Sequence, residues 1–150
     1  MKDINEIYNM LKWENSPKIQ SEGIKAAKKI TNLSLLIQPM TNMTVWEPCA
    51  KILSEKSDEE LEPYLSELLE WLQDLNWTGA TIIELRLKTF SGKKLKLPLE
   101  VAIDKAKKMQ NFDGLKWLYG MSGLIENDEL RTCLSDENVL LLKKYYNGID

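Results

Sequence analysis

Residues 71–80 read WLQDLNWTGA, and the patterns on either side of this stretch indicate a helical hairpin. The helix before it is expected to begin at Pro63, because a proline is tolerated in the first turn of a helix but not deep inside one. It is expected to run to about Leu75. Its leucines recur at helical spacing and form one apolar face, made of Leu65, Leu68, Leu69, Leu72 and Leu75.

The second half of the stretch predicts the turn and the start of the next helix. Asn76 is the expected hinge, since asparagine tolerates the left-handed conformation and also caps helices. The next helix is expected to begin at Trp77 or Thr78, and Gly79 would let its first turn approach a neighbour closely. Trp77 is then expected to be largely buried in the seam of the hairpin.

Helical spacing recurs along the chain, and the segment TIIELRLKTF (residues 81–90) is also interpreted as a helix because Glu84 and Lys88 stand in the favourable i, i+4 order. The expected helix starts are Asn15 or Ser16 before Pro17, Thr44 before Pro48, the capping box Ser57–Glu60, Asn76, and Asp113. The principal starts lie roughly 27–35 residues apart, and periods of about 30–47 residues are typical of helical solenoids. The sequence predicts an all-α fold of about eight helices in one domain, residues 1–150, as either a stack of antiparallel hairpins or a helical bundle.

Composition argues against several classes of function. The 150 residues contain no histidine and two cysteines, which argues against Ser-His-Asp or Cys-His catalysis and against a structural zinc site. The net charge of −3 disfavours nucleic-acid binding. No apolar run approaches the length of a membrane span, and the N-terminus lacks the apolar core of a signal peptide. We therefore expect a monomeric, cytoplasmic protein without cofactor or metal.

Several stretches of the chain resemble a family of small bacterial domains of unknown function. Its core signature, Leu-Leu-Glu-Trp-Leu-Gln-Asp-x-Asn-Trp-Pro, is matched by residues 68–77, and Thr78 stands where the family has proline. The resemblance covers most of residues 4–110. It implies a short HEAT-like α-solenoid of stacked hairpins, and it implies an association with toxin systems in which members are immunity proteins. It brings no catalytic residues with it.

Charge is unevenly distributed along the sequence. Residues 55–74 hold eight acidic residues and one lysine, whereas residues 86–108 hold eight basic residues and two acidic ones. The lysine-rich segment 91–96 is interpreted as a solvated loop between helices. On the helix from Pro63 to Leu75, an acidic stripe is expected to lie beside a tryptophan, a composition common at protein interfaces. The candidate partner-binding residues are Glu67, Glu70, Trp71 and Asp74, together with Trp46 on the preceding helix; the alternative is a solvated helix face with a core tryptophan.

The sequence favours a non-enzymatic binding protein whose partner is a protein, possibly a basic toxin domain that it neutralises as an immunity protein. A HEAT-like scaffold or adaptor that binds a cellular protein or peptide is the alternative. A nucleic-acid-processing enzyme is less compatible with the acidic chain.

Overall fold

The computed structural model describes residues 2–146, which form helices and turns without any β-strand. The predicted all-α class is confirmed, and about eight predicted helices compare with ten α-helices in this part of the chain, several of them only one or two turns long. The α-helices are α1 (Ile4–Met10), α2 (Pro17–Ala27), α3 (Trp46–Ser54), α4 (Asp58–Leu61), α5 (Leu65–Glu70), α6 (Ala80–Lys88), α7 (Gly92–Lys108), α8 (Phe112–Ser122), α9 (Asp128–Cys133) and α10 (Asp136–Tyr146). Five 3₁₀-helices connect them: η1 (Leu33–Leu36), η2 (Met43–Val45), η3 (Glu62–Tyr64), η4 (Trp71–Gln73) and η5 (Gly123–Glu126).

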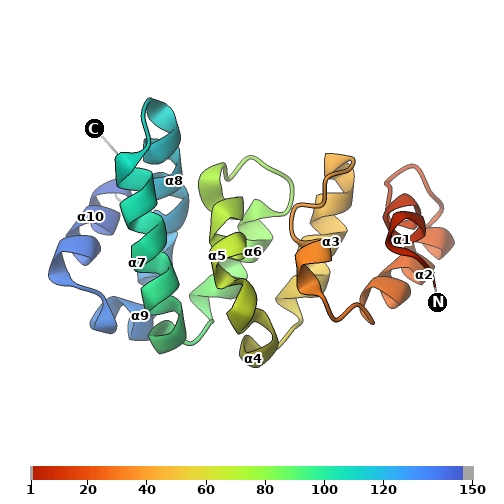
Figure 1. Ribbon diagram of the computed structural model, residues 1–150, viewed down its shortest axis with the longest axis horizontal. Coiled ribbons are helices and arrows are strands. Elements are labelled where there is room, and N and C mark those ends of the chain that lie inside the picture. Colours follow the sequence, from red (N-terminus) through yellow and green to blue (C-terminus); the bar gives the residue numbers. More distant parts are fainter. Residues whose placement is uncertain (1, 147–150) are drawn as a thin grey trace.

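The helices follow one another in chain order along the longest axis of the molecule (Figure 1). The α1–α2 pair lies at one end, and α8, α9 and α10 lie at the other. Packing follows the same order: α2 contacts α3, α3 contacts α6, α5 contacts α7, and α7 contacts both α8 and α9. In the view of Figure 1, α5 and α7 lie in front of α6 and α8.

The predicted helix starts agree with the structure at two positions. Ser16 caps α2 by accepting the Ile19 N–H, and Pro17 occupies the first turn, where its missing N–H is harmless. At α4, the side chains of Ser57 and Glu60 form the full capping box. Both pairs are local, so the sequence alone was sufficient to find them.

Two predicted caps are wrong. Asn42, not Thr44, supplies the capping oxygen before η2, and the bond runs to the Thr44 N–H itself at 2.9 Å. Asn111, not Asp113, stands at the N-cap of α8, with a φ of 66°, and Asp113 lies inside the first turn. Asp113 still favours the helix there, because an acidic side chain interacts well with the positive end of the helix dipole.

The lysine-rich segment 91–96 is not the loop that its composition predicts. It forms the first turn of α7, which begins at Gly92 and is capped by the Ser91 hydroxyl. Two acidic side chains from other elements stabilise this start: Asp58 accepts the Ser91 N–H and Glu129 accepts the Lys93 N–H, both at 2.9 Å. These contacts with distant residues stabilise a helix start where the run of lysines alone predicts a loop.

The hairpin predicted from residues 71–80 is present, with its turn placed differently. The helix that starts after Pro63 ends as η4 at Gln73 rather than at Leu75, and α6 begins at Ala80 rather than at Trp77 or Thr78. The left-handed residue is Gly79, with a φ of 84°, and not Asn76. The Asp74 side chain accepts the Asn76 N–H at 2.8 Å and so forms an Asx-turn that gives the chain its first change of direction.

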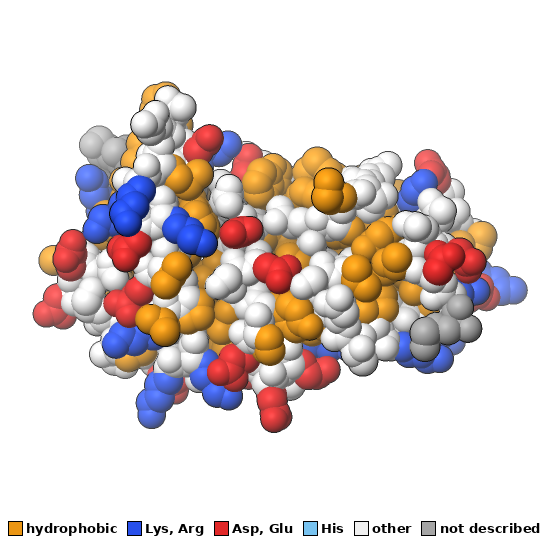
Figure 2. Space-filling view, viewed as in Figure 1, with side chains coloured by type: hydrophobic (Ala, Val, Ile, Leu, Met, Phe, Trp, Pro, Cys, Tyr) orange, Lys and Arg blue, Asp and Glu red, His pale blue; other side chains and the backbone are white. Residues whose placement is uncertain are grey.

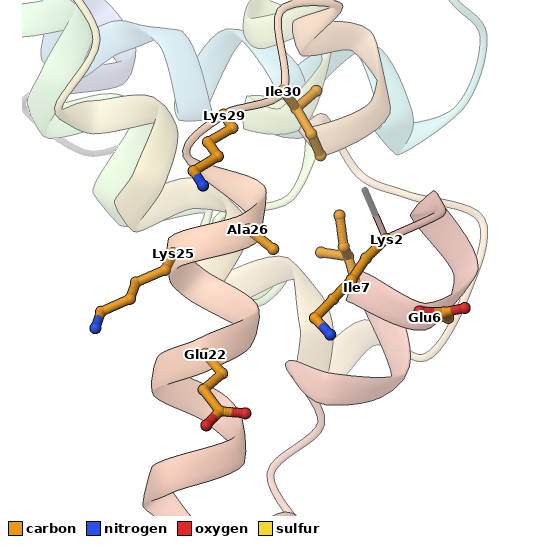
Figure 3. A pocket seen from close by; sticks show the side chains of 8 residues that line it. All are labelled: Lys2, Glu6, Ile7, Glu22, Lys25, Ala26, Lys29 and Ile30. Atoms are coloured by element: carbon orange, nitrogen blue, oxygen red, sulfur yellow. The ribbon is translucent and has the colours of Figure 1, made fainter.

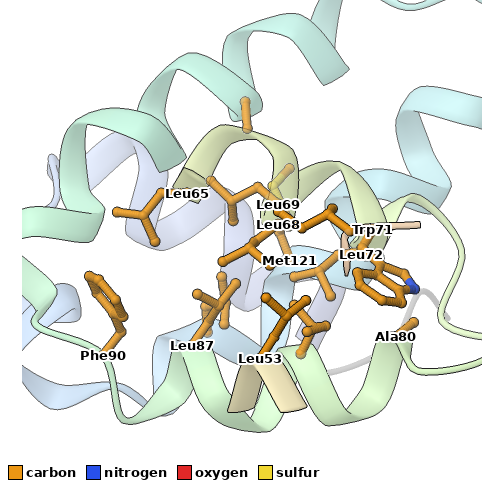
Figure 4. Packing of buried hydrophobic residues seen from close by; sticks show 14 of the residues in the cluster. Leu53, Leu65, Leu68, Leu69, Trp71, Leu72, Ala80, Leu87, Phe90 and Met121 are labelled. Atoms are coloured by element: carbon orange, nitrogen blue, oxygen red, sulfur yellow. The ribbon is translucent and has the colours of Figure 1, made fainter. Parts of the chain in front are cut away.

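The core runs through the whole stack and is densest where α5 and η4 meet α3, α6 and α8. Figure 4 shows this region, with Trp71 beside Leu72 and Ala80 and a layer of leucines from α5 above α6. The five predicted leucines of the α5 face are all in or against the core, four of them buried and Leu75 partly so. The 3.6-residue period therefore identified the buried face correctly.

Candidate functional site

Trp71 is a core residue and not a contact for a partner. Its side chain is 0% exposed, and its indole N–H donates to the Thr78 carbonyl oxygen at 3.0 Å. The sequence places Trp71 at the border of the leucine face and the acidic stripe. In the structure the Trp71 ring points into the core, because the chain turns back at Gly79 and covers the ring.

Gly79 makes this burial possible. A Cβ at position 79 would lie 2.8 Å from Cζ2 of Trp71 and 2.9 Å from Cβ of Ala50. The predicted close approach at Gly79 is confirmed, and the positive φ adds a second requirement for glycine. The stretch 71–80 is thus first of all a structural seam.

Above the buried Trp71 lies an exposed apolar surface, which we call the tryptophan edge and define as Met40, Met43, Trp46 and Trp77. The Trp46 ring packs edge-on against Trp71 and Trp77, with centroid separations of 6.0 and 6.1 Å. Trp46 and Trp77 are partly buried and pack against the core, so Trp77 lies in the hairpin seam as expected but is less enclosed than Trp71. Hydrophobic side chains are visible along this border in Figure 2, over the α5–α6 connection and over the segment before α3.

Met40 is held away from the rest of the protein by a tight turn. The Thr41 N–H donates to the Pro39 carbonyl at 2.7 Å, which closes a three-residue turn with Met40 at its apex. Gln38 adopts a φ of 42°, a left-handed conformation that costs a non-glycine residue about 1–2 kcal/mol. The indole N–H of Trp46 also donates to the Pro39 carbonyl, at 2.8 Å, and anchors the base of the turn. The Met40 side chain is fully exposed.

The three acidic candidates occupy one side of α5 and its end. Glu67 and Glu70 are exposed on α5, one turn apart, and Glu67 accepts a hydrogen bond from the Ser34 hydroxyl at 3.0 Å. Asp74 is half-buried and lies in the connection to α6. Its hydrogen bond from the Asn76 N–H, and then its contact with Lys116, lower the pKa of the Asp74 carboxyl.

The uneven charge of the sequence is largely neutralised in the fold. The acidic stretch 55–74 packs beside basic residues of α2, α6, α7 and α8, and four ion pairs join them: Lys28–Glu55, Arg86–Asp58, Lys94–Glu62 and Lys116–Asp74. Among residues 2–146, neither Glu67 nor Glu70 forms an ion pair. These two carboxylates are what remains of the predicted acidic stripe for an external cation.

The fold places the five candidate residues in three environments. Glu67 and Glu70 face solvent, Trp46 and Asp74 belong to or border the tryptophan edge, and Trp71 lies beneath it. Sequence reasoning missed Met40 and Met43. A signal for them exists: residues 30–46 contain no charged residue, although charged residues make up 29% of the chain.

A separate groove of about 570 Å³ lies between α1 and α2 at the end of the stack. Figure 3 shows Ile7 and Ala26 facing each other across it, with Ile30 at one end and the Lys2 side chain over the opening. Its other lining residues are Glu6, Glu22, Lys25 and Lys29. Because cations and anions alternate on its rim, its charge selects no single class of ligand.

No reactive group stands out in the described residues. Burial raises the pKa of the Cys49 thiol to about 12, which makes it a poor nucleophile at neutral pH. No cluster of three or more histidine, cysteine or acidic side chains in residues 2–146 could hold a metal ion. Burial also raises the pKa of Glu84, but its neighbours Lys88 and Glu126 are already paired with each other at 3.1 Å. Within the same residues, no helix has the length and apolar character needed to cross a membrane.

These features define a small all-helical domain whose distinctive surface is an apolar edge above a buried tryptophan seam. Residues 47–122 match the family described as a domain of unknown function, DUF5071, and this match covers about half of the chain. The chain belongs to this family. The seam residues Trp71 and Gly79, with Trp77, lie inside the matched segment, whereas Met40, Met43 and Trp46 lie just before it. No curated protein and no solved structure matches the chain.

Proposed function

We propose that this protein is a non-enzymatic protein-binding domain, and that it acts in the cytoplasm as an immunity protein that binds and neutralises a cognate bacterial toxin domain. The observation that carries the proposal is the pair of exposed carboxylates on α5. Glu67 and Glu70 lie one turn apart, and neither is neutralised by an ion pair within residues 2–146, although nearby acidic side chains are. Unpaired charge on a rigid helix is suited to steering and selecting a partner of opposite charge.

The arrangement of the helices supports a HEAT-like α-solenoid as the architecture of this domain. Packing joins elements that lie near one another in the chain, such as α1 with α2, α5 with α7, and α7 with α8 and α9, as in stacked repeats. Such stacks present a continuous surface made from successive repeats, and binding along this surface is their usual use. Here α5, the connection to α6 and the segment before α3 would contribute to one binding face.

The proposed mechanism is occlusion of the toxin by a monomer of this protein. Glu67 and Glu70 would meet lysine or arginine side chains of the toxin, and Trp46 would contact an apolar surface. Trp71 has no part in the contact because it is buried, and Asp74 contributes less than its position predicts because Lys116 already pairs with it.

Co-expression of this protein with the product of the neighbouring reading frame, the candidate toxin, tests the proposal. The wild-type protein should protect the cell and form a complex with the module. Replacing both Glu67 and Glu70 with lysine should remove protection, because removing one desolvated interfacial carboxylate typically costs about 2–5 kcal/mol of binding free energy. The matched control is Glu14→Lys with Glu59→Lys, since both residues are exposed and unpaired in residues 2–146 but lie outside α5.

Each outcome has a defined meaning. If the wild type gives neither protection nor a complex, the immunity function is refuted. If the double variant on α5 protects as well as the control, binding uses a different face. A complex with a cellular protein in place of any toxin would establish the adaptor function, which the same exposed surface supports.

A further inference from the structure

We infer that the tryptophan edge is a docking surface for a partner segment that carries an aromatic or aliphatic side chain flanked by lysine or arginine. This inference rests on the proposed function only in that the partner is a protein. It names a surface, Met40, Met43, Trp46 and Trp77, of which only Trp46 was a candidate from the sequence.

The composition of the edge is that of an interface core. Fully buried interface cores are depleted in charge and enriched in tryptophan and methionine. The segment 30–46 has this composition within an otherwise charged chain. Met43 is 42% exposed and Met40 is entirely so, and hydrogen bonds from Trp46 to Pro39 and from Thr78 to Met43 hold their segment against the two partly buried indoles. Methionine adapts its shape to irregular apolar surfaces, which suits a binding role.

The backbone around Met40 supports a role in contact rather than in folding. The unfavourable φ of Gln38 and the tight turn from Pro39 to Thr41 project a side chain that contributes no core packing. Strained conformations of this kind persist where surrounding contacts enforce them, and they concentrate at functional positions. Here the enforcing contacts are the Trp46 hydrogen bond to Pro39 and the Thr78 hydroxyl, which donates to the Met43 carbonyl at 2.5 Å.

The polar groups at the edge indicate the charge of the partner. The segments 37–47 and 73–79 contain two acidic residues, Glu47 and Asp74, and no basic residue. Lys116 reaches the edge from α8, but Asp74 neutralises it at 3.1 Å. Glu47, next to Trp46 in the chain, forms no ion pair among residues 2–146 and leaves the border with a net negative charge. An apolar centre with a net negative border favours a segment with basic residues next to its apolar anchor.

The indole of Trp77 offers one further point of recognition. The indole N–H groups of Trp46 and Trp71 are bonded to backbone carbonyls of this chain. Among residues 2–146, no acceptor is bonded to the N–H of Trp77. A partner backbone carbonyl could therefore accept this N–H while its side chain lies against Met40 and Met43.

Selection from a phage-displayed library of random twelve-residue peptides, with the purified full chain as bait, tests the inference. We expect enrichment of peptides that combine an aromatic or aliphatic residue with neighbouring lysine or arginine. The affinity of an enriched peptide should fall about tenfold or more in Met40→Ser, which corresponds to about 1.4 kcal/mol. Leu97→Ser is the matched control, because Leu97 is also exposed, at 70%, but lies on α7. The Leu97→Ser variant should bind the enriched peptide with the affinity of the wild type.

Three results would overturn the inference: no enrichment, enrichment of acidic peptides, or equal binding by Met40→Ser and the wild type. Because Met40 makes no core contact, the variant should fold normally, and its far-ultraviolet circular dichroism checks this. The library contains no toxin, so a failure of the immunity function leaves this result standing. Conversely, toxin protection that persists in Met40→Ser would show that immunity uses the α5 face without the edge.

Discussion

Trp71 and Trp77 stand six residues apart in one short stretch, yet they belong to two different regions of the molecule. Trp71 lies in the seam, with its ring covered on every side and its N–H bonded within the chain. Trp77 lies on the edge above it, partly buried against the core and packed edge-on with Trp46. The ring that the acidic stripe marked as a binding anchor is the structural one, and the ring expected to be structural is the more accessible one.

The difference shows that a short loop can place two similar residues in different environments. Gly79 turns the chain left-handed and brings the backbone of Thr78 over the Trp71 ring. The same turn leaves Trp77 at the outer side of the connection. The following substitutions separate the two regions, from the largest expected effect to the smallest.

Trp71→Ala should destabilise the protein by about 3–5 kcal/mol, the usual cost of deleting a large, fully buried aromatic side chain. Urea unfolding followed by circular dichroism would measure the change. Trp13→Ala is the control, because Trp13 is 56% exposed and should cost far less. A smaller loss for Trp71→Ala than for Trp77→Ala would contradict the assignment of Trp71 to the seam.

Gly79→Ala should cost about 1–3 kcal/mol, because the added Cβ meets Trp71 and Ala50 and the φ of 84° is unfavourable for alanine. Asn76→Gly provides the comparison. Glycine there should bring no stabilisation, since Asn76 does not adopt a positive φ. Differential scanning calorimetry of the two variants would decide the matter, and a stabilised Asn76→Gly would restore Asn76 as the hinge.

Trp77→Ala should cost about 2–3 kcal/mol of folding free energy, less than Trp71→Ala, because part of the Trp77 ring stays exposed to water. Its larger effect should be on binding. The affinity of an edge-selected peptide, measured by isothermal titration calorimetry, should fall in Trp77→Ala. Unaltered peptide affinity together with a loss above about 3 kcal/mol in stability would give Trp77 a purely structural role.

Lys116→Met should lower the free energy of unfolding by less than about 1 kcal/mol, because the Lys116 side chain of its ion pair with Asp74 is exposed to solvent.

The stabilisation that Asp74 contributes should depend on pH. The pKa of Asp74 is lowered in the folded protein, so its contribution is complete above the ordinary aspartate value near 3.8 and disappears as the pH falls through the lower folded value. Wild type and Asp74→Ala should therefore differ in stability at neutral pH and converge in acid. If the stability difference between wild type and Asp74→Ala grew as the pH fell, the Asp74 pKa would be raised in the folded protein and the prediction would be wrong.

The sequence was sufficient for features that depend on neighbours within a few residues. These are the all-helical class, the leucine face of α5, the capping box at Ser57 and the helical nature of residues 81–90. Sequence-based prediction failed for features that depend on contacts with residues far away in the chain. The first turn of α7 looked like a loop because its anions, Asp58 and Glu129, come from other helices.

The candidate site was only partly predictable for the same reason. Glu67 and Glu70 are exposed as their helical spacing predicts. The burial of Trp71 and the pairing of Asp74 with Lys116 depend on the path of the chain after Gln73 and on α8. Met40 had a sequence signal in the uncharged segment 30–46, but an uncharged segment is as consistent with a buried core as with an interface.

Hydrogen exchange of the tryptophan indole N–H groups tests the contrast between seam and edge most directly. Two-dimensional ¹H–¹⁵N spectra, assigned with single Trp→Phe variants, would follow each ring separately. The Trp71 N–H should exchange slowly, because it is buried and bonded to the Thr78 carbonyl, whereas the Trp77 N–H should exchange rapidly and broaden or shift when an edge-selected peptide binds. A protected Trp77 with a rapidly exchanging Trp71 would contradict the account.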